Sequence, residues 1–314
     1  MHDGEVTPAA TFILLSYNQE SSIRASMESV LTQDCEPIEI IVSDDASTDG
    51  TFTIIKQLAQ EYAGPHRVIA RQNDVNIGTN RHIERAIELS SADLMIWTAG
   101  DDINATYRAK RIIEAFRQTQ AKLLFSNAIT ISSDGTAGSD AYRRALFYRE
   151  YSRQEAALSF ELYLGATAAW HKDLYRKYGG FPPERAYEDL ILGFRAVLEQ
   201  GVHYINEKLV TYQEGVGISS QLAKHVSKLG NRERRTAILH SQIKVLEQRL
   251  RDAKVFGLAA DDPVQVAIVT QLETLQVRLD YYTWSADSRR RLLARPLRHG
   301  NALLAEAIRD LRKR

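Results

Sequence analysis

The first 131 residues alternate short apolar runs with segments whose apolar side chains recur at helical spacing, and this alternation constrains the fold most. The apolar runs are residues 11–17, 38–44, 67–71, 94–98 and 122–131. The helical segments between them are residues 21–33, 51–62, 80–90 and 106–119. Strands that are apolar on both faces and separated by helices are typical of a parallel sheet covered on both sides. We therefore predict an α/β fold with a mostly parallel central sheet flanked by helices.

Polar residues follow the predicted strands at three places, which are Ser16-Tyr17, Asp44-Asp45 and Asp101-Asp102. Ligands of open parallel sheets bind beyond the carboxyl ends of the strands. Because the three clusters lie at such ends, we expect them to meet at one edge of the sheet and to form a binding site.

The adjacent carboxylates Asp101 and Asp102 follow the small residues Ala99 and Gly100. Two like charges so close repel each other unless a positive group lies beside them. A hard divalent cation would relieve the repulsion, because such cations take oxygen ligands. The alternative interpretation is a turn with a helix N-cap, since Asp is common in both.

Composition excludes several classes of function. The 314 residues are 44% hydrophobic and carry a formal net charge of zero, so a globular protein with no nucleic-acid partner is expected. Cys35 is the single cysteine, which excludes an internal disulfide and a cysteine-rich zinc site and suits a reducing cytoplasm. We find no signal peptide and no apolar run near the ~20 residues of a spanning helix. We expect a cytoplasmic protein whose membrane contact, if any, is peripheral at the inner face.

The second half contains a further strand pattern at 165–171 and a helix at 187–201, followed by a closing strand or hairpin at 202–212. The helix has a predicted buried stripe and a predicted C-cap at Gly201. The stripe is Leu190, Phe194, Val197 and Leu198. Glu188 and Asp189 lie in the first turn of this helix, where favourable interaction with the helix dipole is an alternative explanation for two acids.

Two amphipathic helices are predicted after residue 220, and together they indicate an antiparallel hairpin. Their apolar positions are Leu239, Ile243, Leu246 and Leu250 in one and Ile268, Leu272, Leu275 and Leu279 in the other. The seam packs either on the main domain or on another subunit. The last stretch, residues 288–314, is basic and amphipathic, which fits either a solvated helical face or docking on anionic lipid headgroups.

Motifs of other enzyme classes are missing from the sequence. The turn after the first strand has no glycine, as a dinucleotide-binding oxidoreductase would need, and no phosphate-binding lysine loop, HExxH or Gly-x-Ser-x-Gly motif occurs. A carboxylate-rich site able to hold a metal and a nucleotide remains.

The stretches "FILLSYNQESSI", "IEIIVSDDASTDGT" and "ADLMIWTAGDDI" resemble the inverting family 2 glycosyltransferases, which have the GT-A fold. The resemblance is close over residues 11–119 and looser over 160–212. It implies a metal-dependent, inverting, hexosyltransferase-type enzyme that moves a sugar from a nucleoside-diphosphate sugar to an acceptor hydroxyl in cell-surface polysaccharide or O-antigen biosynthesis. The alternatives are a catalytically idle sugar-nucleotide-binding or scaffold protein and a sugar-phosphate nucleotidyltransferase.

The resemblance also implies site residues. Those for the nucleotide sugar are Ser16, Tyr17, Asp44, Asp45 and Asp101, with Arg71 as a weaker candidate. Asp102 falls on the position of the metal ligand, for Mn²⁺ or Mg²⁺. Glu188 and Asp189 match the family's catalytic Glu-Asp pair, with Asp189 as the base. Two departures stand out, because Ala99 and Gln213 occupy positions where the family usually has Asp and Arg.

We expect a GT-A catalytic domain over residues 1–219, with a nucleotide-binding half at 11–131 and an acceptor half at 132–219, and a helical C-terminal region over 220–314. The expected donor is a UDP- or dTDP-linked sugar, and the expected acceptor is a glycan or a lipid-linked saccharide. The C-terminal helices would serve homo-oligomer assembly, membrane-surface docking or both.

Overall fold

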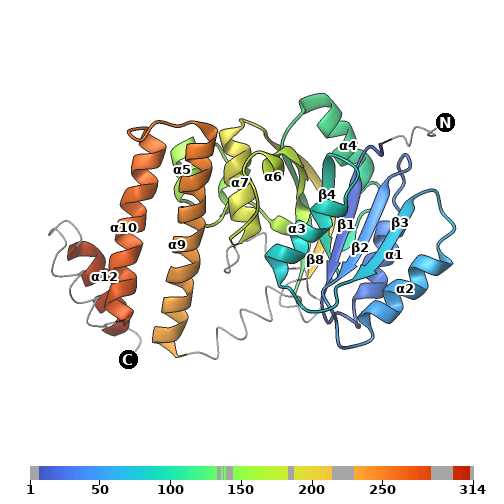
Figure 1. The fold of residues 1–314 in the computed structure, drawn as a ribbon, viewed down its shortest axis with the longest axis horizontal. Coiled ribbons are helices and arrows are strands. Elements are labelled where there is room, and N and C mark those ends of the chain that lie inside the picture. Colours follow the sequence, from blue (N-terminus) through green and yellow to red (C-terminus); the bar gives the residue numbers. More distant parts are fainter. Residues whose placement is uncertain are drawn as a thin grey trace.

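The computed structural model describes residues 7–132, 136, 138, 144–182, 187–213, 230–283 and 300–311. An eight-stranded sheet lies at its centre, in the order β3-β2-β1-β4-β7-β6-β8-β5, with helices packed against it (Figure 1). β1 lies parallel to β2 and β4, β2 to β3, and β6 to β8. The predicted α/β fold with a mostly parallel sheet is confirmed.

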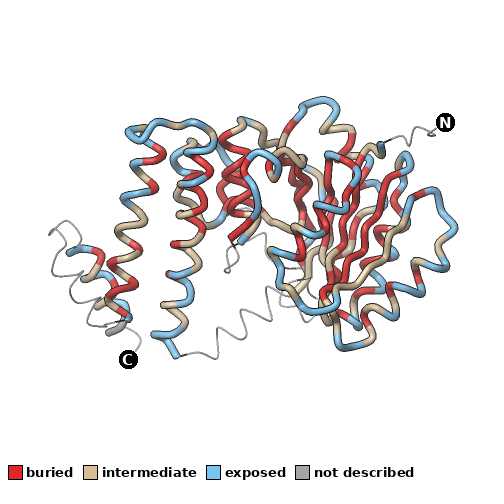
Figure 2. The backbone as a smooth tube through the Cα atoms, in the orientation of Figure 1, coloured by how far each residue is buried: buried red, intermediate tan, exposed pale blue. Residues whose placement is uncertain are grey.

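The first half of the chain follows the predicted alternation of strands and helices. The strands are β1 (Thr11–Ser16), β2 (Glu39–Asp44), β3 (Arg67–Gln72) and β4 (Leu94–Ala99). The helices are α1 (Ile23–Leu31), α2 (Thr51–Glu61), α3 (Thr79–Leu89) and α4 (Arg108–Thr119). Phe12 and Leu14 of β1 pack with α1, α2 and α4, whereas Ile13 packs with α3, so both faces of the sheet are covered. Figure 2 shows β1, β2 and β4 buried along most of their length, whereas the edge strand β3 is only partly buried.

The second half completes the sheet with antiparallel pairings. Its strands are β5 (Ile103–Asn104), β6 (Leu123–Ile131), β7 (Ala169–His171) and β8 (Val202–Gln213). β7 is antiparallel to β4 and β6, and β5 is antiparallel to β8. The predicted strand at 165–171 is therefore too long, because Gly165–Thr167 forms the 3-10 turn η3. The segment after residue 201 is one strand, which excludes the hairpin.

Short helices and the long helix α7 join these strands. They are the 3-10 helix η2 (Leu146–Tyr148), α5 (Arg153–Leu158), α6 (Asp173–Arg176) and α7 (Glu188–Leu198). The predicted stripe of α7 is buried, but the prediction of a single apolar face is wrong. Every residue from Leu190 to Leu198 is buried, because α7 has the sheet on one side and C-terminal helices on the other.

The end of α7 also differs from the prediction. Gln200, not Gly201, takes the left-handed backbone conformation, with φ of 53°. A Cβ on Gly201 would lie 2.9 Å from the backbone nitrogen of Lys122. Gly201 is thus needed because the segment after α7 passes close to the backbone of Lys122, and it does not cap the helix.

The C-terminal region contains α9 (Asn231–Phe256), α10 (Pro263–Thr283) and α12 (Gly300–Leu311). The predicted hairpin is confirmed, with Leu246 and Leu275 in one core cluster that also contains Phe194 and Leu198 of α7. The seam therefore packs on the same chain. The predicted boundary near residue 220 and most of the basic stretch lie outside the described residues. Within the described helices, none is long and apolar enough to cross a membrane.

Candidate active site

The ends of β1 and β2 place Ser16 and Asp44 side by side. The two residues are in register, and the Ser16 hydroxyl donates to Asp44 Oδ1 over 3.1 Å. Asp44 Oδ2 accepts from the backbone nitrogen of Ser47 at 2.8 Å and from Gln72 Nε2 at 2.9 Å. The buried carboxylate of Asp44 is thereby held in one orientation. Tyr17 directly follows the last residue of β1 and is partly exposed.

Asp45 organises the loop that leads into α3. Its carboxylate accepts from Asn73 Nδ2 at 2.7 Å and from the backbone nitrogens of Ile77 and Gly78, both at 3.0 Å. Gly78 has φ of +80°, a backbone conformation that is unfavourable for residues with a side chain. Asp45 therefore shapes the edge of the site, in addition to the ligand contact that the resemblance implies.

Arg71 reaches the same edge from β3. It donates to the hydroxyl of Ser43 at 2.7 Å and to Oδ1 of Asn73. The Ser43 hydroxyl also lies 2.7 Å from Nε2 of the buried His82. Burial, together with the nearby Arg71 charge, lowers the pKa of His82 to about 4, so this imidazole is neutral at pH 7.

The turn after β4 is held in place by α1. The hydroxyl of Ser22 donates to the carbonyl of Gly100 at 2.8 Å, and that of Ser26 donates to the carbonyl of Ala99 at 2.9 Å. A Cβ on Gly100 would lie 2.6 Å from Gln19 Oε1, so a larger residue would displace Gln19. The paired serines on one face of α1 fix the position of the two acids that follow.

Asp101 and Asp102 are both buried at this turn but differ in their contacts. Asp101 accepts from Gln19 Nε2 at 2.7 Å, which ties it to the end of β1, whereas Asp102 Oδ1 has no hydrogen-bond partner in the described part of the chain. Burial and the adjacent Asp101 charge raise the pKa of Asp102 to about 8. Thr211 of β8 pairs with Ile103 in an antiparallel arrangement. Gln213, which stands where the family usually has Arg, is therefore at the end of β8 that runs beside the two acids.

A divalent cation fits the unpartnered oxygen of Asp102. Within the described ranges, no group of three or more His, Cys, Asp or Glu side chains is placed to hold a metal. Mg²⁺-type sites often use one or two carboxylates together with water and substrate phosphates. The unpartnered oxygen of Asp102 therefore suits a metal shared with a bound diphosphate.

Arg108, which the sequence reasoning did not single out, lies fully buried behind this turn. Its Nη2 donates to the carbonyls of Trp97 at 2.9 Å and Ala166 at 3.2 Å, and its Nη1 donates to Asn104 Oδ1. The positive charge counteracts part of the pKa rise of Asp102. No sequence signal indicated this, because a basic residue in the first turn of an amphipathic helix usually faces solvent.

Glu188 and Asp189 begin α7 on the other side of η3. Asp189 Oδ1 accepts from the backbone nitrogen of Leu190 at 2.8 Å, and a Cβ on Gly165 would lie 3.5 Å from Asp189 Oδ2. Loss of solvent raises the pKa of both carboxyls, to about 6 for Asp189 and about 7 for Glu188, where the Asp189 charge adds to the rise. Arg108, whose charge acts on Asp102, donates to Ala166 of η3, and Asp189 lies against Gly165, so both acidic groups are linked to this turn.

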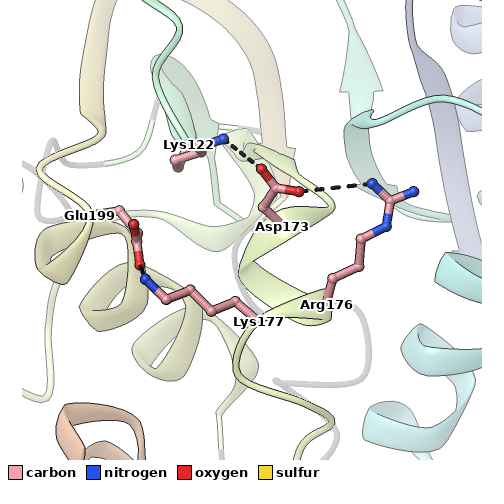
Figure 3. Close-up of a pocket in the computed structure, with 5 residues that line it drawn as sticks. All are labelled: Lys122, Asp173, Arg176, Lys177 and Glu199. Atoms are coloured by element: carbon pink, nitrogen blue, oxygen red, sulfur yellow. Dashed lines mark hydrogen bonds and ion pairs between the residues drawn. The ribbon is translucent and has the colours of Figure 1, made fainter. Parts of the chain in front are cut away.

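A separate cavity of about 410 Å³ lies at the opposite edge of the sheet (Figure 3). Lys122 and Asp173 in its wall form an ion pair at 2.7 Å, as do Lys177 and Glu199. Lys122 precedes β6, which runs in the same direction as β4, so this cavity lies away from the strand ends that carry the acids. Arg176 in the same wall pairs with Asp93 at 2.7 Å, so each charged side chain of the cavity has an ion-pair partner, and the cavity is not part of the candidate active site.

The arrangement of acids at the strand ends of a GT-A fold defines a glycosyltransferase class. The family model for glycosyl transferase family 2 matches residues 11–179, more than half of the chain. The chain therefore belongs to glycosyltransferase family 2.

Known proteins share both sequence and fold with this chain. An Escherichia coli protein, UDP-Glc:alpha-D-GlcNAc-diphosphoundecaprenol beta-1,3-glucosyltransferase WfaP, is 30% identical over 116 residues, which are 37% of this chain and 43% of that protein. The chain spans less than half the length of the curated relatives it matches.

Two solved structures share the fold at 16% identity and a TM-score of 0.55. They are Staphylococcus aureus TarS 1–349 in complex with UDP-GlcNAc, with 87% of this chain and 81% of that chain covered, and the Pyrobaculum calidifontis mannosyltransferase PcManGT in complex with GDP-Man and Mn²⁺, with 98% and 81% covered.

Proposed function

We propose that the protein is a metal-dependent, inverting glycosyltransferase of the hexosyltransferase type that uses a nucleoside-diphosphate sugar. One observation carries the proposal: Asp102, with a buried and unpartnered carboxylate oxygen, and the partly exposed Asp189 are both linked to η3. Arg108, whose charge acts on Asp102, donates to Ala166 of this turn, and Asp189 lies against Gly165. A divalent cation with a diphosphate suits the first group, and a general base suits the second. The UDP-GlcNAc in TarS and the GDP-Man with Mn²⁺ in PcManGT support this substrate class.

The nucleoside would lie along the carboxyl ends of β1 and β2. Ser16, Tyr17 and Asp44 would contact the base and ribose, with Asp45 and Arg71 holding the surrounding loop. Asp101, at the end of β4, would accept from the ribose. These roles follow from the family resemblance and from the fact that the structure brings these residues to one edge of the sheet.

Asp102 would hold Mn²⁺ or Mg²⁺, which when bound stabilises negative charge on the leaving diphosphate. The acceptor oxygen forms a bond to the anomeric carbon while the bond from that carbon to the phosphate oxygen breaks. Asp189 takes the proton of the acceptor hydroxyl, and the nucleoside diphosphate leaves. A single displacement of this kind inverts the anomeric centre, and a raised pKa suits Asp189 as a base near neutral pH.

The acceptor is proposed to be a glycan or a lipid-linked saccharide, in cell-surface polysaccharide or O-antigen biosynthesis. The printed name of WfaP, with its diphosphoundecaprenol-linked acceptor, supports this class. We further propose, from sequence alone, a cytoplasmic protein whose basic C-terminal stretch contacts the inner face of the membrane, and C-terminal helices that also serve assembly.

The test is release of nucleoside diphosphate from UDP-glucose, UDP-GlcNAc, dTDP-glucose and GDP-mannose, each with Mn²⁺ and then with EDTA. We expect Mn²⁺-dependent release with one donor and its loss in Asp189→Asn, while the variant still binds that donor. Binding without release, even with added saccharide acceptors, would favour the idle binding protein. Formation of a sugar nucleotide from a nucleoside triphosphate and a sugar phosphate would favour the nucleotidyltransferase.

A further inference from the structure

The C-terminal hairpin touches the helix that carries the proposed base. Figure 1 shows α9 and α10 at the end of the molecule away from β1, β2 and β3, with α7 between the hairpin and the sheet. Apolar residues of α9 and α10 share a core cluster with Ala157 of α5 and Phe194 of α7. The hairpin is therefore in a position to influence how α7 lies.

Arg249 of α9 makes the polar contacts nearest to Asp189. Its side chain is fully buried, between the rings of Phe160 and Phe194, whose centroids lie 5.9 and 5.7 Å from the guanidinium carbon. The Nε and Nη2 groups donate to the carbonyl of Leu190 at 3.2 and 2.9 Å. The Nη1 group donates to the carbonyls of Ala157 at 3.0 Å and Ser159 at 2.7 Å.

These three carbonyls come from the end of α5 and the start of α7. The carbonyls in the last turn of a helix have no partner within the helix, so Arg249 satisfies two acceptors at the end of α5. Leu190 directly follows Asp189, and its backbone nitrogen donates to Asp189 Oδ1 at 2.8 Å. One guanidinium thus fixes the residue whose amide orients the carboxylate of Asp189.

Arg249 also brings a positive charge to Asp189 from a separate helix. Arg249 on α9 favours the ionised carboxylate of Asp189 and opposes the effect of burial on its pKa. The Asp189 charge in turn raises the pKa of Glu188 on the same helix and of Tyr163 on the loop before η3, and Asp252 on α9 acts on Arg249 together with Asp189.

We propose that Arg249 is a positioning residue for the general base: it holds the first turn of α7 so that the Asp189 carboxylate faces η3. The inference rests on the proposed function, because it assigns Asp189 the role of base. The helical C-terminal region would then contribute to catalysis without contributing a reacting group.

A second buried contact between α7 and α9 provides a matched control. Arg195 of α7 forms an ion pair with Asp252 of α9, at 2.9 Å from Nε to Oδ2. The remaining donors of Arg195 bind the carbonyls of Leu174, Gly179 and Gly180. Asp252→Asn therefore loosens the same pair of helices one turn from Arg249, without removing a contact to Leu190.

The experiment compares Arg249→Gln, Arg249→Lys and Asp252→Asn with the wild type in the full chain. The donor is the one of the panel above that the wild type turns over. For Arg249→Gln we expect kcat to fall by ~10²-fold, since small displacements of a reacting group have effects of that size, with KM for the donor unchanged. The acidic limb of the pH–rate profile should move up by about one pH unit, because an opposite charge has been removed.

Arg249→Lys keeps the charge and loses the forked hydrogen bonds. We expect its acidic limb to stay within a few tenths of a pH unit of the wild type, while kcat still falls. Asp252→Asn should lower the unfolding temperature and leave the acidic limb in place. The proposal would be overturned if the acidic limb of the pH–rate profile shifted equally in Arg249→Gln and Asp252→Asn. It would also be overturned if Arg249→Lys had the kcat of the wild type. If Arg249→Gln does not fold, the kcat of Arg249→Lys at unchanged donor KM decides.

One readout does not depend on turnover. The pKa of the Asp189 carboxyl can be measured by carbon-13 NMR, with Asp189→Asn to assign the signal. A higher pKa in Arg249→Gln than in Asp252→Asn supports the contact between Arg249 and Asp189, and equal values overturn it. If the wild type releases no nucleoside diphosphate from any donor, the proposed function fails, and the NMR result still tests the contact separately.

Discussion

Replacement of Asp102 by Asn is expected to stabilise the metal-free protein and to abolish its response to metal. Asp102 is buried, its Oδ1 atom has no partner, and Asp101 is adjacent. The nearby Arg108 charge offsets only part of this cost, because the pKa of Asp102 remains raised, to about 8. Ionised Asp102 therefore destabilises the fold when no cation is bound.

The size of the effect follows from these contacts. Asp102 is ionised in the unfolded chain at pH 7.5, so folding must bury its charge or take up a proton, whereas Asn requires neither. Each pH unit between the unfolded and the folded pKa is worth about 1.4 kcal/mol, so Asp102→Asn should raise the free energy of unfolding in EDTA by several kcal/mol at pH 7.5. For an acid with a raised pKa, the folded state binds more protons than the unfolded state between about pH 4 and pH 8. Wild-type stability falls as pH rises through this window, so the difference between variant and wild type should grow with pH.

Ligand binding should narrow this difference in stability. Mn²⁺ with UDP or GDP, at a free concentration of about 100 times Kd, stabilises the state that binds it by ~2.7 kcal/mol. The wild type should gain this amount, and Asp102→Asn should gain almost none. Urea denaturation in EDTA and in Mn²⁺ with each nucleotide measures both quantities.

Asp173→Asn serves as the control, because Asp173 pairs with Lys122 at the other edge of the sheet. It should respond to Mn²⁺ and nucleotide as the wild type does. If Asp102→Asn were less stable than the wild type in EDTA and still gained stability from Mn²⁺ and nucleotide, the reasoning about Asp102 would be refuted.

Three further outcomes are expected. Asp189→Asn should lower turnover by roughly 10²–10⁴-fold while the affinity for the donor is kept. In a pH–rate profile, wild-type turnover should rise with pH through about 6 as Asp189 ionises. The pKa of His82 is about 4 in the folded protein and about 6.5 in the unfolded chain, so the free energy of unfolding should fall as the pH is lowered from 6.5 to 4, by up to ~1.4 kcal/mol per pH unit. Urea denaturation should show a shallower dependence on pH in His82→Gln. Gly201→Ala should cost about 1–3 kcal/mol in the same denaturation assay, because its Cβ would meet the Lys122 backbone; an unchanged midpoint would contradict this.

The sequence predicted the nucleotide-binding half well, because there local pattern and tertiary environment agree. Strands such as 38–44 are buried on both faces in a parallel sheet and therefore read as continuous apolar runs. The ends of such strands must meet at one edge, so the proximity of Ser16 and Asp44 followed from the fold class. Asp101 reaches the same edge through Gln19, a link that periodicity does not reveal.

Predictions were poorer where packing overrides local pattern. Helix α7 looked amphipathic, with one apolar stripe, but C-terminal helices cover its other face, and the sequence of α7 alone does not contain that information. The strand predicted at 165–171 is short because Gly165–Thr167 forms the turn on which Asp189 and Arg108 act. The roles of the individual site residues stay predictions.

Three fully buried arginines explain most of what the sequence concealed. Arg108, Arg195 and Arg249 lie on helices, where a pattern-based interpretation assigns a basic residue to solvent. Each donates to backbone carbonyls of turns or helix ends, which regular secondary structure leaves without partners. The contacts of Arg108 to Ala166 and of Arg249 to Leu190 tie η3 and the first turn of α7 to guanidinium groups far away in sequence. The geometry of these two segments therefore depends on α4 and α9, helices that carry none of the motifs of the family resemblance.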